Sequence, residues 1–283
     1  MLRIPKTYCL LSVQAYLQNV QADIDAITDF HDRVDKAVQL WSGKGGSKES
    51  KAAFDAIKID LDTLRSGTFY CCYCETNTAG LATHGANDDD PEHSPIEHIW
   101  PKSLYPERAF VWENYLPICW RCNTGHKLDQ WAIFDNTTGI FHDVTPPHRA
   151  KGTRRTLPLA GSNVFIDPRT EDPLAFLTLD FANFKLKPRK GLSYSDATRA
   201  AYTVKVLALN DGPITQARST GFGNICYELT EYLKRRDPKN PQIEARMRDN
   251  FRKLQHPTVW QEMKRQKNHP RFRHIFCSEM QNW

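Results

Sequence analysis

The chain has 283 residues, of which 40% are hydrophobic and 25% charged, and its formal net charge is +5. Such a composition is ordinary for a globular protein that buries a substantial core. No apolar run approaches the roughly 20 residues that a membrane-spanning helix needs, and the first residues lack the apolar centre and cleavage site of a signal peptide. We therefore expect a cytoplasmic protein with no membrane partner.

Apolar residues recur at steps of three and four from about 10 to 41, which predicts one long amphipathic helix. The same spacing predicts a second helix over about 49–65. Between them, the glycine-rich segment 42–48 lacks the spacing of a phosphate-binding loop and predicts a flexible turn. We interpret 1–66 as a helical hairpin packed on the core. A partner-binding role for its long helix stays open.

Two Cys-x-x-Cys pairs follow, Cys71 with Cys74 and Cys119 with Cys122. Four thiolates at such spacings give Zn²⁺ its preferred tetrahedral shell, and bound metal adds folding energy to a short, loop-rich segment. We therefore predict a structural zinc site. Whether Cys72 replaces Cys71 as a ligand stays open, and redox or catalytic use of the pairs is the competing interpretation.

The segment 67–136 is expected to form the centre of the molecule. Ile96–Trp100 predicts a short strand that Pro101 ends, and a helix is expected to begin near Cys122 and to run to about Asp135. Beyond it, the pattern predicts β-like pieces and then helices. The β-like pieces are expected at Gly139–Val144, Asn163–Ile166 and Phe176–Leu179, and the helices at about 195–209, 213–236, 242–255 and 258–267.

Gly221 and Gly223 are expected to weaken or kink the second of these helices. Lysine and arginine far outnumber acidic residues between 234 and 273. A nucleic acid or an acidic protein would suit this basic end as a partner, and a solvated helical face is the alternative. The prediction is an α+β protein, mostly helical, with segments 1–66 (helical hairpin), 67–136 (zinc-clipped core), 137–236 (mixed β/helical) and 237–283 (basic helical).

Residues suited to phosphodiester hydrolysis lie between the cysteine pairs and directly after the second pair. This reaction needs a base for the attacking water and a cation on the phosphate. His98 can take a proton near neutral pH. Glu97 precedes it on the predicted strand, and neighbouring strand residues point to opposite faces, which suits a metal ligand beside a base. Asn123 can offer an amide oxygen to the same Mg²⁺ ion, and Asn114 could orient the imidazole.

At this point the residues match a known pattern. The series Cys71-x-x-Cys74, Glu97-His98-Ile99-x-Pro101, Asn114-Tyr115-Leu116 and Cys119-x-x-Cys122-Asn123 resembles the HNH (ββα-metal) endonucleases. The resemblance implies a central ββα-metal module with structural Zn²⁺ and catalytic Mg²⁺ or Mn²⁺. It implies zinc ligands Cys71, Cys74, Cys119 and Cys122, magnesium ligands Glu97 and Asn123, and catalytic residues His98, Glu97, Asn114, Asn123 and His126.

The chain departs from the family pattern in two places. The usual Asp-His is here Glu97-His98, which keeps a carboxylate on a longer side chain. The family's closing lysine is replaced by His126, with Lys127 next, so His126 is expected to contact phosphate or to add a metal ligand.

A narrower resemblance is to the PtuB-type HNH nucleases, which act in Septu and some retron anti-phage systems beside an ABC/SMC-like ATPase, PtuA. It is carried by 69–75, 96–103, Phe165-Ile166-Asp167-Pro168-Arg169, Asp172-Pro173 and Leu207-x-Leu209-Asn210. It implies such an ATPase as the partner and nucleic acid of the invader or host as the substrate, and we expect that nucleic acid to be DNA. Two alternatives stay open: an RNA- or tRNA-cleaving HNH nuclease, and a catalytically silent, zinc-stabilised nucleic-acid-binding module.

Overall fold

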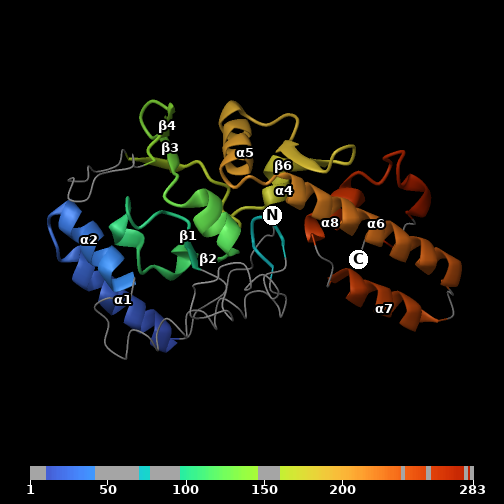
Figure 1. Cartoon of the computed structure of the whole chain (residues 1–283), viewed down its shortest axis with the longest axis horizontal. Coiled ribbons are helices and arrows are strands. Elements are labelled where there is room, and N and C mark those ends of the chain that lie inside the picture. The colour runs from blue at the N-terminus through green and yellow to red at the C-terminus, as the bar shows by residue number, and fades with distance from the viewer. Residues whose placement is uncertain are drawn as a thin grey trace.

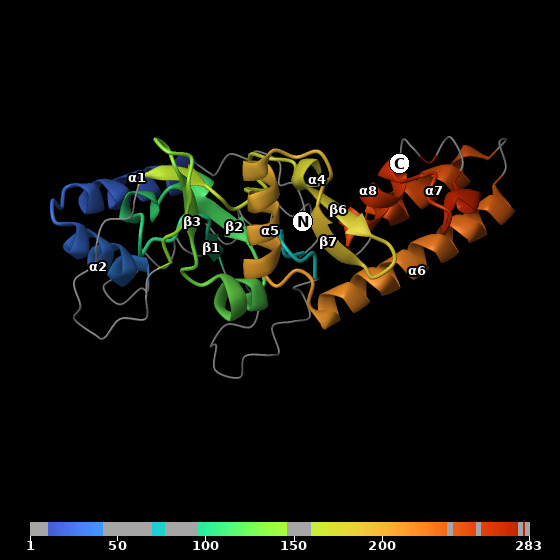
Figure 2. The ribbon, with the colours of Figure 1, turned by 90° about the horizontal axis from the view of Figure 1, so that it is seen from above.

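The structure, a computed structural model, describes residues 11–41, 70–76, 96–145, 160–236, 240–252, 256–276 and 280. Figures 1 and 2 show these parts in an elongated arrangement, with the N-terminal helices at one end, the C-terminal helices at the other and small sheets between them. The described part is α+β with helices predominating, as the sequence predicted. Within it, none of the helices is long and apolar enough to cross a membrane.

The N-terminal segment forms two helices, α1 (Leu11–Asp25) and α2 (Phe30–Trp41), which pack against each other (Figure 1). The prediction of one helix from 10 to 41 was wrong because Asp29 begins a new one. Its carboxylate accepts hydrogen bonds from the backbone N–H groups of His31 and Asp32, at 2.9 and 3.1 Å, as a helix-capping residue does. The helix predicted over 49–65 lies outside the described residues.

Strand β1 (Ile96–His98) pairs antiparallel with β2 (Tyr115–Pro117), and His98 stands opposite Tyr115. The connecting loop contains two helical turns, η2 (Pro106–Arg108) and η3 (Trp112–Asn114). Beyond β2, the second cysteine pair leads into η4 (Arg121–Lys127). The Glu97-His98 pair therefore lies on β1, next to β2 and to η4.

Element η4 is a π-helical turn of seven residues, so the helix predicted from Cys122 to Asp135 was wrong beyond Lys127. Leu128 ends it with a φ of 47°, a conformation that does not continue a right-handed helix. The apolar residues that follow form β3 (Ala132–Asp135), the middle strand of a sheet, instead of a helix face.

The remaining strands form two small antiparallel sheets. One has β3 in its middle, and the other is a separate pair of strands. The remaining strands are β4 (Phe141–Asp143) and β5 (Gly161–Asn163) on either side of β3, and β6 (Leu177–Asp180) paired with β7 (Lys185–Pro188). The β-like pieces predicted at 139–144 and 176–179 are confirmed as β4 and β6. The piece predicted at 163–166 was wrong beyond Asn163, because β5 ends at that residue. Gly161 is needed where β5 approaches β3, since a Cβ there would lie 2.5 Å from the Phe134 carbonyl oxygen.

The predicted C-terminal helices are confirmed within a few residues. They are α5 (Tyr194–Val206), α6 (Gly212–Arg235), α7 (Pro241–Arg252) and α8 (Pro257–Arg265), with the short α4 (Pro173–Phe176) and η5 (Arg273–Ile275) beside them. Helix α6 runs uninterrupted through Gly221 and Gly223. The free energy gained by burying one face of α6 outweighs the roughly 1 kcal/mol of helix stability that each interior glycine costs.

A buried carboxylate attaches α8 to the sheet of β6. Glu262 accepts hydrogen bonds from the Thr178 hydroxyl at 3.0 Å and the Leu179 backbone N–H at 3.1 Å, and Arg265 pairs with it at 2.6 Å. One continuous cluster of buried apolar side chains extends from α1 to the C-terminal end and includes Leu17 and Trp260. The candidate site lies within this core.

Candidate active site and metal centre

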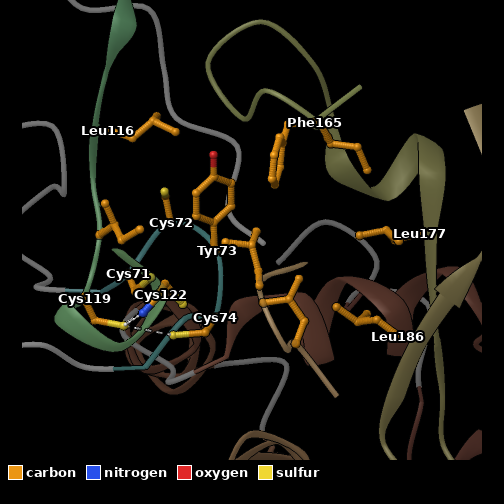
Figure 3. Packing of buried hydrophobic residues seen from close by; sticks show 14 of the residues in the cluster. Cys71, Cys72, Tyr73, Cys74, Leu116, Cys119, Cys122, Phe165, Leu177 and Leu186 are labelled. Carbon is orange, nitrogen blue, oxygen red and sulfur yellow. Dashed lines mark hydrogen bonds between the residues drawn. The ribbon is translucent and has the colours of Figure 1, made fainter. Parts of the chain in front are cut away.

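The four cysteines of the two Cys-x-x-Cys pairs come together in the structure. The sulfur atoms of Cys71, Cys74, Cys119 and Cys122 all lie within 4.8 Å of one another, and all four side chains are buried. Figure 3 shows them facing one another, whereas the Cys72 side chain points away toward Leu116. The structure therefore selects Cys71 over Cys72 as the fourth member of the group.

The geometry of this cluster fits a tetrahedral metal ion. With Zn–S bonds of about 2.3 Å, neighbouring sulfurs of a tetrahedral site are about 3.8 Å apart, and Cys74 Sγ lies 3.7 Å from Cys119 Sγ. Hydrogen bonds among the thiols lower the pKa of Cys74 and of Cys119. Burial raises the pKa of Cys71, and the hydrogen bond with Cys119 raises that of Cys122, so the metal-free cluster shares its protons unevenly. The cluster could bind a metal such as zinc, and its closed shell suits a structural ion.

Backbone hydrogen bonds shape the turn that carries the first cysteine pair. The Cys71 N–H donates to the Thr76 carbonyl at 3.0 Å, and the Glu75 N–H donates to the Cys71 carbonyl at 2.9 Å. Glu75 itself is buried at a φ of 63°, and its carboxylate accepts hydrogen bonds from the hydroxyl and the backbone N–H of Thr258, the latter at 3.3 Å. The cysteine turn is thereby attached to the start of α8.

His98 is held in one orientation at the end of β1. Its Nε2 lies 2.9 Å from the carbonyl oxygen of Ala109. A carbonyl oxygen only accepts hydrogen bonds, so in the neutral imidazole Nε2 carries the proton and Nδ1 keeps the lone pair. The hydroxyl of Tyr115, opposite His98 in the hairpin, donates to the same oxygen at 2.9 Å. The Ala109 carbonyl thus fixes which ring nitrogen can act as a base.

Asn114 fixes the loop that contains Ala109. Its amide nitrogen donates to the carbonyls of Arg108 and Trp100, at 2.8 and 3.0 Å, and its amide oxygen accepts from the Trp100 N–H at 2.8 Å. These hydrogen bonds engage the Asn114 amide with the backbone, whereas the sequence predicted that it orients the imidazole. Its place in the site is to connect the two ends of the loop between β1 and β2.

Trp41, at the end of α2, covers the imidazole. The rings of Trp41 and His98 are 4.1 Å apart between centroids at 71°, in an edge contact. His98 is only 5% exposed. This burial, aided by the positive charge of Lys102, holds the pKa of His98 well below its ordinary value of 6.5. The imidazole is therefore neutral near pH 7 and shielded from solvent.

Glu97 pairs with a lysine that sequence reasoning gave no role. The Lys127 ammonium group bonds to Glu97 Oε1 and donates to the His98 backbone carbonyl at 3.0 Å. Lys127 is completely buried and its Nζ lies 5.5 Å from the ring centre of Trp131. Burial raises the pKa of Glu97, although the charge of Lys127 opposes this. The pair holds η4 against β1.

Asn123 and His126 both lie on η4, close to β1. The Asn123 amide nitrogen is 3.4 Å from the Ile96 carbonyl, at the limit of a hydrogen bond. His126 is partly buried, its carbonyl accepts from the Gln130 side chain at 2.6 Å, and its Nε2 is enclosed without a partner among the described residues. Glu97, His98, Asn123 and His126 therefore come from two adjoining elements.

The predicted magnesium ligands offer the oxygen atoms that Mg²⁺ prefers, but both side chains are engaged with protein partners in this structure. Glu97 is engaged by Lys127, and Asn123 by the Ile96 carbonyl. Among the described residues, the group of His, Cys, Asp and Glu side chains close enough to share one ion is the four-cysteine cluster. The oxygen-ligand site would require the Glu97 carboxylate to change partners.

Sequence reasoning also missed residues that act through the backbone. Arg169 is buried and donates to the carbonyls of Trp112 and Tyr115, at 2.6 and 2.8 Å, which supports the β1–β2 hairpin from outside. The available signal was the place of Arg169 at the end of the 165–169 stretch that carries the narrower resemblance. Its partners could not be predicted, because they are more than fifty residues away. For Lys127, its position directly after His126 was the available signal.

Comparison with known proteins gives one informative similarity. No protein-family model matches the chain. A stretch of 65 residues is 34% identical to the Septu protein PtuB of Bacillus thuringiensis. The stretch covers 23% of this chain and 22% of the relative, so the match spans about a fifth of the length of that protein. It supports a distant relation to Septu PtuB.

Proposed function

We propose that the protein is a metal-dependent HNH endonuclease that hydrolyses phosphodiester bonds in DNA. The observation that carries the proposal is the fixed imidazole of His98, whose Nε2 bonds to the Ala109 carbonyl and leaves Nδ1 to take a proton from water. A positioned base of this kind is typically worth about 10²–10⁴-fold in rate.

The order of elements supports the HNH assignment. An antiparallel hairpin, β1–β2, precedes the helical turn η4, and Asn123 and Lys127 of η4 contact Ile96 and His98 of β1. A ββα-metal module would have this order, with the first two elements supplying the base and the third a metal ligand. The neighbouring cysteine cluster would hold Zn²⁺ and stabilise the module without taking part in hydrolysis.

The catalytic ion would be Mg²⁺ or Mn²⁺, held by oxygens of Glu97 and Asn123. It would supply positive charge to the scissile phosphate. Because Glu97 is paired with Lys127 in this structure, we propose that ion binding accompanies an exchange of that pairing. The chain's own contribution is the orientation of His98 and the choice of its basic nitrogen.

The distant relation to Septu PtuB supports a biological setting for this activity. We propose that the protein is the effector of an anti-phage defence complex. Its partner would be an ABC/SMC-like ATPase of the PtuA type. Copurification of the full chain with that ATPase tests the partner separately from the chemistry.

The test of the activity is a cleavage assay with the full chain, alone and with the ATPase, on DNA and RNA in one competition digest. We expect DNA cleavage with Mg²⁺ or Mn²⁺, none with EDTA, and none by His98→Ala. His142→Ala, on the outer strand β4, is the matched control and should cut normally. Equal cutting by His98→Ala would overturn the proposal, and preferential cutting of RNA would transfer it to an RNA or tRNA substrate.

A second candidate function is a catalytically silent, zinc-stabilised nucleic-acid-binding module. The enclosure of His98 beneath Trp41 favours it, since a base must reach its water. Retention of DNA in a gel shift, without cleavage under any metal or partner condition, would support this alternative.

A further inference from the structure

We propose that Gln21 of α1 is a positioning residue for His98. Its side-chain amide clamps the loop whose Ala109 carbonyl binds the imidazole. The inference rests on the proposed function, in which His98 is the base. It makes the N-terminal helix pair part of the site instead of an addition to it.

The amide of Gln21 bonds to both ends of the segment that contains Ala109. Its Nε2 donates to the Pro106 carbonyl at 3.1 Å, and its Oε1 accepts from the Phe110 N–H at 2.9 Å. These partners are 85 and 89 residues away in the sequence. Ala109 lies between them and donates its own N–H to the Pro106 carbonyl at 3.1 Å. A single side chain thus fixes the position of this turn relative to α1.

The position of Gln21 on its helix indicates a specific task. It lies on the buried stripe of α1, together with Val13, Leu17 and Ile24, and is 8% exposed. Packing alone would be served by an apolar side chain there, because a buried amide costs free energy unless it is hydrogen-bonded. The Gln21 amide reaches three partners, the third being Asp25 at 3.0 Å, so its bonding capacity is largely used.

The clamp is supported from outside the loop. Arg33 of α2 bonds to the Asp25 carboxylate at 2.9 Å, and Asp25 in turn orients the Gln21 amide. Asn114 holds the same loop from inside, through the Arg108 carbonyl. The Ala109 carbonyl is therefore fixed between two amide side chains that come from different elements. Loss of either one frees it to shift and the imidazole to turn with it.

The test compares Gln21→Met, which keeps the length of the side chain and removes its hydrogen bonds, with Gln18→Met on the exposed face of the same helix. We expect Gln21→Met to lower kcat about 10- to 100-fold with little change in KM, because a misplacement of about 1 Å can cost about 10²-fold. Gln18→Met should match the wild type. Gln21→Glu retains the acceptor for the Phe110 N–H but places a carboxylate oxygen against the Asp25 carboxylate and the Pro106 carbonyl, so it should lower kcat at least as much as Gln21→Met.

A second readout does not depend on cleavage. In ¹⁵N-histidine-labelled protein, the ring nitrogen signals report which nitrogen of His98 carries the proton, with His98→Ala to assign them. We expect the Nε2–H form in the wild type and Gln18→Met, and a mixture of both forms in Gln21→Met with unchanged zinc content. An unchanged His98 signal in a folded Gln21→Met would overturn the inference, as would wild-type kcat in an active enzyme. If the wild type does not cut, the proposed function fails while this readout still decides the role of Gln21.

Discussion

Lys127 and Glu97 form an ion pair that solvent does not reach, for Lys127 is 0% and Glu97 3% exposed. The same ammonium group bonds to the backbone carbonyl of His98 at 3.0 Å. Removing one member of such a pair leaves an uncompensated buried charge, which costs about 3–5 kcal/mol. The pair is therefore a structural support of the site as well as an obstacle to metal binding at Glu97.

Lys127→Met and Glu97→Gln should each lower the free energy of unfolding by about 3–5 kcal/mol, and the double variant by clearly less than their sum. Urea denaturation of the four proteins measures this cycle. Lys187→Met, which breaks the exposed pair with Asp180, is the control and should cost less than about 1 kcal/mol. Additive effects at Glu97 and Lys127 would contradict a coupled pair.

Cys71→Ser or Cys119→Ser should lower zinc content and thermal stability together. A buried structural ion contributes more than about 4 kcal/mol, which corresponds to a melting temperature lower by about 10 °C in a chain of this size. Metal analysis and differential scanning calorimetry on the same samples measure both. Cys226→Ser, at a half-buried cysteine outside the cluster, should change neither. Loss of zinc with normal melting would exclude a structural role.

Trp41→Ala should raise the pKa of His98 toward 6.5, because burial is the largest cause of its low value and Trp41 supplies part of that burial. Exposing the ring to water stabilises the charged imidazolium, so His98 becomes protonated at a higher pH. An NMR titration of the His98 ring measures the change. Trp120→Ala, at an exposed tryptophan, is the control and should leave the pKa unaltered.

Arg246, exposed on α7, should contribute to DNA binding through phosphate if the basic C-terminal end is a nucleic-acid surface. Arg246→Gln should then reduce the slope of log K against log salt by about one and weaken binding most at low salt. Fluorescence anisotropy over a salt series measures the slope. Lys190→Gln, at an exposed lysine before α5, is the comparison. An unchanged slope would leave this end to a protein partner or to solvent.

Periodicity predicted the C-terminal helices well, because each of them buries a stripe that local spacing reveals. It failed where a single side chain decides the outcome. Asp29 divides the N-terminal helix by capping α2, and Leu128 ends η4 before the apolar run that becomes β3. In both places the hydrophobic pattern continues while the backbone direction changes.

The candidate site was predicted in its parts but not in its connections. The Cys-x-x-Cys spacing predicted the four-cysteine cluster, and the adjacent Glu97 singled out His98 as a candidate base. The enclosure of His98 by Trp41 depends on packing between residues far apart in the sequence, which no local pattern encodes. Gln21 did carry a signal, since it is the polar member of an apolar stripe. The roles of His98, Glu97, Asn114, Asn123 and His126 stay predictions.

The bond between Glu75 and Thr258 has a consequence for how the chain folds. It joins residues that are 183 positions apart, directly beside the first cysteine pair. Thr258 must leave the ribosome before this contact can form, and contacts of such high sequence separation form slowly. A nascent chain that ends before α8 therefore carries the cysteine turn without the two Thr258 donors of the Glu75 carboxylate.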